Sequence, residues 1–135
     1  MQPDKAAAVR DWLSKASNDL RGAHIDLDAD PPLIEDALFH CQQAAEKTLK
    51  GYLTSHDKPF KKTHDLDELS RVCLEVDATL RDIVLPAIPL TVFAWEFRYP
   101  GDTHVPPMTE ARAALDIAEA LYKAVLQRLP QPCHP

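Results

Sequence analysis

The segment from Phe39 to Leu53 constrains the fold of this chain more than any other stretch, because it is the most regular part of the sequence. At about 100° of rotation per residue in an α-helix, one stripe collects Ile34, Leu38, Cys41, Ala45, Thr48 and Tyr52. The opposite side collects His40, Gln43, Glu46, Lys47 and Lys50. This pattern is typical of an amphipathic helix with a wide apolar face toward a core.

The same reading along the chain predicts helices and no strands. The predicted helices are Asp4–Leu27, Pro31–Ser55, a third helix capped by Thr63, a short helix around Leu80–Val84, a fourth long helix Pro89–Arg98, and a last helix capped by Thr109. Gly51 lies inside the second, so either a neighbouring helix packs closely there or the helix ends early. The sequence therefore predicts an all-α, up-and-down antiparallel bundle of four long helices plus a short one over residues 1–129. A Pro-rich tail, 130–135, follows.

The composition limits the classes of function. The chain has 135 residues, which suits one domain, and a net charge of −6. General nucleic-acid binders are more often basic, so any RNA contact needs a local basic patch. The three cysteines have no redox or zinc-finger spacing and indicate reduced thiols, with Cys41 and Cys73 as small core residues. The absence of a long apolar run and of a signal region predicts a cytoplasmic protein without a membrane span.

Metal and cofactor binding are not expected from the sequence. The six histidines are scattered without a His-x3-His spacing. Asp26, Asp28 and Asp30 resemble the start of a calcium loop, but the glycine and the later glutamate of that motif are missing. The three glycines form no phosphate-binding loop.

Three segments together carry a family resemblance: Phe39–Lys50, Lys62-Thr63-His64-Asp65-Leu66, and Phe97-Arg98-Tyr99-Pro100-Gly101. With the long first helix and the last helix after Thr109, they cover nearly the whole chain, and in this order the sequence resembles the HEPN family of small helical bundles. The resemblance implies a homodimer that occurs beside a minimal nucleotidyltransferase. It also implies two activities found in such proteins, which are nucleotide binding and ribonuclease activity as the toxin of a toxin–antitoxin pair.

The ribonucleases of this family use an arginine followed, after four to six residues, by a histidine. Arg98 and His104 match that spacing, but Pro100-Gly101 replaces the usual polar residues, and Pro106 stands where a tyrosine is often found. Chemically, Arg98 could clamp a phosphate while His104 acts as acid or base, and a dimer could bring two such pairs into one cleft. The alternative is that Arg98 ends a helix in an ion pair and His104 is a solvated loop residue.

The candidate binding residues for a nucleotide or a nucleic-acid phosphate are Arg98, Tyr99, Lys47, Lys50, Gln43 and His64. Arg98 would hold phosphate, Tyr99 would stack on a base, and Lys47 or Lys50 would add charge, in a cleft between the second helix and the Arg98–Gly101 turn. The alternative for the lysines is a solvated helix face on which Glu46 and Lys50 form an i,i+4 pair. For His64 it is a capping role.

The leading hypothesis is a non-catalytic or weakly catalytic HEPN-type module that binds a nucleotide or nucleic-acid phosphate and acts with a nucleotidyltransferase partner. The first alternative is a metal-independent ribonuclease toxin using Arg98 and His104. The second alternative is a purely structural dimerisation module. Phe39, Val105 and Met108 are the predicted dimer contacts, because they are large apolar residues expected outside the core.

Overall fold

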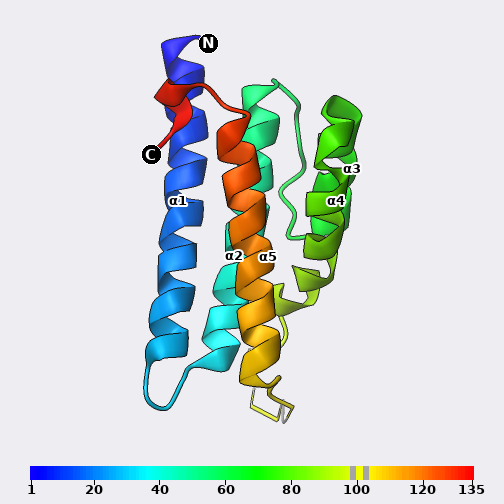
Figure 1. The fold of residues 1–135 in the computed structure, drawn as a ribbon. Coiled ribbons are helices and arrows are strands. Elements are labelled where there is room, and N and C mark those ends of the chain that lie inside the picture. The colour runs from blue at the N-terminus through cyan, green and yellow to red at the C-terminus, as the bar shows by residue number, and fades with distance from the viewer. Residues whose placement is uncertain (98–99, 102–103) are drawn as a thin grey trace.

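The computed structural model describes residues 1–97, 100–101 and 104–135, and it confirms the predicted all-α bundle. Figure 1 shows α1 (Pro3–Asp28), α2 (Ile34–Ser55) and α5 (Met108–Gln127) side by side, with α3 (Leu66–Val76) and α4 (Arg81–Val84) along one flank. Short 3-10 segments complete the bundle: η1 (Ala78–Leu80), η2 (Leu85–Ala94) and η3 (Gln131–Cys133). Over the described ranges, no helix has both the length and the apolarity needed to cross a membrane.

The helix predicted to organise the chain, α2, lies at the centre of the bundle. It contacts α1, α3, α5 and η2, so that its surroundings are protein on more than one side. Its apolar stripe forms the core together with the apolar faces of α1 and α5. Cys41 and Cys73 are buried there as predicted, and burial raises the pKa of each thiol to about 12.

Several helix starts differ from the sequence prediction. α2 begins at Ile34 rather than Pro31, since the residue before Pro32 is pushed out of the helical region. α3 is capped by Asp65 rather than Thr63: the Asp65 carboxylate accepts a hydrogen bond from the Asp67 amide at 3.0 Å. α5 begins at Met108, one residue before the predicted cap Thr109.

The fourth long helix does not form as an α-helix over the residues that the structure describes. Residues 85–94 instead form the 3-10 segment η2, and Arg98 lies outside the described residues. The physical reason is the pair Pro86 and Pro89, whose missing amide hydrogens and bulky rings interrupt the i to i−4 hydrogen bonds of an α-helix. Phe93 and Leu90 still reach the core from this segment.

The Pro-rich tail packs against the first helix. Its single turn, η3, contacts α1, and the Arg10 guanidinium donates a hydrogen bond to the carbonyl of Pro132 at 2.8 Å. Cys133 is fully buried by this contact. The tail is non-α-helical, as its three prolines require, yet it closes the end of the core where both termini lie (Figure 1).

Asp77, at the junction of α3 and η1, ties three parts of the bundle together. Its carboxylate accepts hydrogen bonds from the Thr79 hydroxyl and amide, from Tyr52 at 3.0 Å and from Arg128 at 3.1 Å. These bonds, chiefly that of the Thr79 hydroxyl, lower the pKa of Asp77 from 3.8 to about 2. We expect Asp77→Asn to lower the free energy of unfolding by roughly 1–2 kcal/mol at pH 7, measured by urea denaturation.

The pH dependence of this effect has a defined sign. Because the folded-state pKa of Asp77 lies below its unfolded value, the stabilisation is complete above about pH 4 and is lost as the pH falls toward 2. The difference between wild type and Asp77→Asn should therefore shrink between pH 4 and pH 2. Asp116→Asn, at an exposed position of α5, is the matched control, and an equal loss of stability there would contradict the assignment.

Candidate functional site

The polar face of α2 is buried or half-buried, unlike the solvated face that was the alternative for its lysines. Glu46 is 3% exposed and Lys50 is 6% exposed. The Glu46 carboxylate accepts hydrogen bonds from Lys50 Nζ at 3.0 Å and from Gln42 Nε2 at 3.2 Å, and it lies 2.6 Å from Nδ1 of His64. The predicted i,i+4 pair of Glu46 and Lys50 therefore forms, but inside the protein.

Two aromatic rings cover this pair. Lys50 Nζ lies 5.6 Å from the ring centroid of Trp12 on α1 and 5.8 Å from that of Phe60 in the loop before α3. The two rings meet edge to face. The helical pattern of α2 alone places Lys50 on the outer side, because this pattern does not show that the loop carrying Phe60 folds back over it. The Lys50 ammonium is engaged inside the fold, so a phosphate could reach it only by displacing Glu46.

Lys47 is closer to the surface and takes part in a second network. Asp19 of α1 accepts a hydrogen bond from Lys47 Nζ at 2.7 Å through one carboxylate oxygen and contacts His40 Nδ1 at 2.8 Å through the other. The side chain of Lys47 is 20% exposed. It can therefore offer charge to a ligand at the surface, in competition with Asp19.

Gln43 and His64 connect these networks to the solvent. Gln43 Nε2 donates to Oε1 of Gln42 at 2.6 Å, and Gln42 in turn donates to the carbonyl of His64 at 3.1 Å. The His64 side chain is 61% exposed while one ring nitrogen contacts Glu46. His64 thus anchors its loop to α2 and takes no part in capping α3, where Asp65 has that role.

A surface hollow of about 390 Å³ lies between α2 and the residues just before Arg98. Its lining residues are Glu35, Asp36, Phe39, Glu96 and Phe97. Arg98 and Tyr99 themselves lie outside the described residues. Gly101 has φ +105°, a conformation that favours glycine, in agreement with the predicted turn at Pro100-Gly101.

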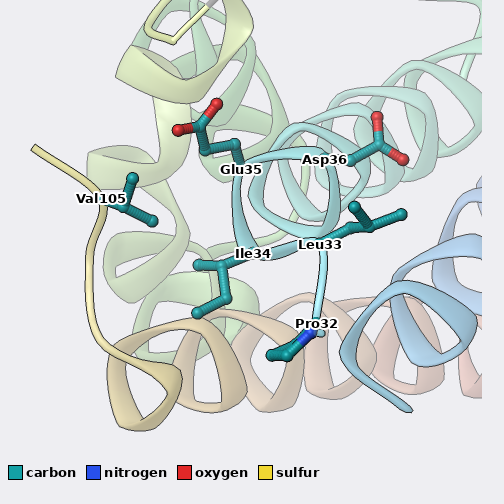
Figure 2. A pocket seen from close by; sticks show the side chains of 6 residues that line it. All are labelled: Pro32, Leu33, Ile34, Glu35, Asp36 and Val105. Atoms are coloured by element: carbon teal, nitrogen blue, oxygen red, sulfur yellow. The ribbon is translucent and has the colours of Figure 1, made fainter. Parts of the chain in front are cut away.

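The adjoining hollow, of about 330 Å³, is more apolar. Figure 2 shows Val105 across from Ile34, with Glu35 at the rim and Asp36 on the far side of the helix end. Leu33 and Val105 are exposed by 54% and 45%, and His104, the residue before Val105, is also exposed. Of the predicted dimer contacts, Val105 is thus at the surface, Phe39 is half-buried in the neighbouring hollow, and Met108 packs partly against the core.

The predicted binding residues that the structure describes, Gln43, Lys47, Lys50 and His64, do not line the hollow beside Phe39. Phe97, the last described residue before Arg98, lines the hollow together with Phe39. Lys47 lies roughly 12 Å farther along the α2 axis, as a rise of 1.5 Å per residue requires, and Lys50 farther still. The described lining of the hollow carries three carboxylates, Glu35, Asp36 and Glu96, which sequence reasoning missed.

Asp19 was not predicted as a site residue, and Asp26 was considered only as part of the rejected calcium loop. Their spacing on α1 was nevertheless informative. They are seven residues apart on α1, which puts both on one face of the helix, next to the apolar stripe. Both are buried, at 9% and 7% exposure. Burial, and then contact with the Asp36 carboxyl, raises the pKa of Asp26 to about 6, while nearby His40 opposes the rise. Acidic residues in the buried register of a helix predict partners on the facing helix.

Comparisons with known proteins agree with this architecture. The family model described as the HEPN domain matches residues 9–129. The crystal structure of TT1696 from Thermus thermophilus is similar, with 32% sequence identity and a TM-score of 0.70 over 90% of this chain and 98% of that chain. A comparison with curated protein sequences finds no match. From its sequence, its helical order and its fold, this chain belongs to the HEPN family.

Proposed function

We propose that this chain is a HEPN module that binds a nucleotide, or a nucleotide unit of RNA, in the hollow between α2 and the segment leading to Arg98. The observation that carries the proposal is the pair of aromatic side chains, Phe39 and Phe97, in one hollow of about 390 Å³. Sequence-independent stacking of a base on an aromatic ring is a general mode of nucleic-acid binding. The volume is in the range of small-molecule sites.

The carboxylates of the hollow favour a base or ribose there rather than a phosphate. Glu35, Asp36 and Glu96 can accept hydrogen bonds from exocyclic amino groups or sugar hydroxyls. These carboxylates repel a phosphate group, so the phosphate of the bound nucleotide must lie outside the hollow, next to a positively charged side chain. The proposal gives this role to Arg98, because a guanidinium binds phosphate through two parallel hydrogen bonds. Tyr99 is an additional stacking surface in the proposal.

A second copy of the chain is part of the proposal. Leu33 and Val105 line one hollow and expose 54% and 45% of their surface, which is unusual for two large apolar residues at one solvated site. In a homodimer that buries Leu33 and Val105, the proposed nucleotide-binding hollow of each copy would lie near the shared interface. The nucleotidyltransferase partner rests on the family resemblance alone, and an adjacent gene for such an enzyme would support it.

Isothermal titration of the purified protein with AMP and ATP tests the proposal. We expect saturable binding, with an affinity at least tenfold lower in Arg98→Ala and about tenfold lower in Phe39→Ala, since stacking contributes roughly 1–3 kcal/mol per base. His104→Ala should bind as the wild type does. Arg112→Ala, an exposed arginine on α5, is the matched control for loss of one positive charge.

Two outcomes would overturn this reading. Equal affinity in wild type and Arg98→Ala would show that the phosphate lies elsewhere, and no binding of either nucleotide would remove the proposed ligand class. Incubation with total RNA decides between binding and cleavage. Degradation by the wild type but not by His104→Ala would establish the ribonuclease alternative, which the exposed position of His104 keeps chemically feasible.

A further inference from the structure

Three potential metal ligands converge from two helices near the α1–α2 turn. Asp26 comes from α1, and Asp36 and His40 come from successive turns of α2. His40 Nε2 lies 3.9 Å from Asp26 Oδ2 and 3.5 Å from Asp36 Oδ2. One ligand atom of each residue lies within 4.8 Å of the other two. Small movements of these three side chains would let all three ligand atoms coordinate one metal ion.

An independent observation is that one of these atoms is buried without a hydrogen bond. Asp26 is 7% exposed, and its Oδ2 has no hydrogen-bond partner among the described residues. Burial of a carboxylate oxygen without a donor is costly, and such atoms in native proteins are nearly always satisfied by a donor, water or an ion. Since the same Oδ2 is the atom that faces His40 Nε2, a cation between them would satisfy it.

The histidine is held as metal-binding histidines usually are. Asp19 Oδ1 lies 2.8 Å from His40 Nδ1, and Lys47 donates to the other oxygen of Asp19 at 2.7 Å. A carboxylate that accepts a hydrogen bond from one ring nitrogen fixes the tautomer and leaves the lone pair of the other nitrogen for a metal. In this chain that other nitrogen is Nε2, which faces Asp26 and Asp36.

Gly22 of α1 makes room for the ring. A Cβ at position 22 would lie 3.0, 3.1 and 3.2 Å from three ring atoms of His40. Nearly equal distances to these adjacent atoms mean that residue 22 lies over the face of the ring, not in its plane. The plane that contains the Nε2 lone pair is therefore clear of α1 at this residue.

We propose that Asp26, Asp36 and His40 form a binding site for a divalent transition-metal ion of the zinc class. Zinc bound to nitrogen and carboxylate oxygen at its usual distances separates tetrahedral ligand atoms by about 3.4 Å. The His40–Asp36 distance of 3.5 Å matches this value, and the His40–Asp26 distance of 3.9 Å must shorten when the ion binds. Imidazole disfavours Mg²⁺ and Ca²⁺, which prefer oxygen ligands in larger number. The Asp36 side chain is 59% exposed, so a fourth position is open to water.

The site would fasten α1 to the beginning of α2, and it does not depend on the proposed nucleotide site. The alternative to a bound metal ion is a second proton on the His40 ring. A doubly protonated His40 could neutralise Asp19, Asp26 and Asp36 as an ion-pair cluster, with no metal bound. The two states differ in whether Zn²⁺ binds through His40, which can be measured directly.

The test uses the untagged full chain after treatment with EDTA. We expect one equivalent of Zn²⁺ per chain by equilibrium dialysis, and a rise in Tm of about 5 °C or more at a hundredfold excess over Kd. Mg²⁺ at the same concentration should give no shift. Asp26→Asn and His40→Gln should each lower the zinc affinity at least tenfold. Gly22→Ala should do the same without removing a ligand, because it pushes the imidazole out of place.

Matched controls are His24→Gln and Asp28→Asn, an exposed histidine and an exposed acid of α1 near the same end, and both should bind zinc as the wild type does. In the wild type, zinc should shift the ring resonances of His40 selectively in NMR spectra, a readout that does not require any variant to fold. Failure of zinc to bind, unchanged affinity in His40→Gln, or shifts confined to other histidines would each overturn the proposal in favour of the ion-pair cluster.

Discussion

Replacing Glu46 by alanine is expected to lower the free energy of unfolding by about 3–5 kcal/mol, because it leaves a buried lysine charge without its carboxylate. Glu46 and Lys50 are both more than nine-tenths buried, and Nζ lies 3.0 Å from Oε2. The change also removes the acceptor for Gln42 and the contact of His64 that fastens the loop to α2. Urea denaturation followed by circular dichroism measures the effect.

The chain offers a matched control in another i,i+4 pair. Asp67 and Arg71 form an ion pair of 2.9 Å on α3, but their side chains are 42% and 76% exposed. Exposed pairs of this kind contribute roughly 0.2–1 kcal/mol, so Arg71→Ala should have a small effect. The double substitution Glu46→Leu with Lys50→Met removes both buried charges and should cost less than Glu46→Ala alone. Equal, small effects at both pairs would show that the inner pair is solvated.

The bundle itself was predictable because it depends on periodicity. The stripes of α1, α2 and α5 repeat over many turns, so errors at single positions do not change the helical assignment. The helix boundaries depend on single residues, so one proline can move them. Pro31-Pro32 moved the start of α2, and Pro86 with Pro89 changed the fourth helix into a 3-10 segment. Both changes follow from the backbone chemistry of proline, which outweighs the apolar pattern.

The candidate site was less predictable because it depends on contacts between elements distant in the sequence. The polar face of α2 was correctly identified, but its burial depends on Trp12 of α1 and Phe60 of the following loop. Asp19 and Asp26 can be recognised as site residues only once α1 is known to pack against His40. A pattern along one helix shows which residues share a face, and it does not show what covers that face.

The second large effect is expected at Gly51. The sequence allowed either close packing of a neighbouring helix or an early end of the helix at this residue, and the structure shows close packing. α2 continues through Gly51 to Ser55, and α1 packs closely against it: a Cβ at position 51 would lie 3.2 Å from Trp12 Cβ and 3.4 Å from Leu13 Cδ2. We expect Gly51→Leu to lower the free energy of unfolding by about 3 kcal/mol, at the upper end of overpacking effects, despite its better helix propensity. Thermal and urea denaturation measure the loss.

Gly51→Ala should have a much smaller effect, because the gain of about 1 kcal/mol in helix propensity offsets part of the strain. Ala120→Leu on the exposed face of α5 is the control for adding a leucine to a helix, and it should be nearly neutral.

The crowded atom belongs to Trp12, whose ring also covers Lys50. Gly51→Leu should therefore displace that ring and change its fluorescence, and its cost should be less than additive with that of Glu46→Ala. Strict additivity would mean that the α1–α2 contact and the buried ion pair are independent, contrary to the shared role of Trp12.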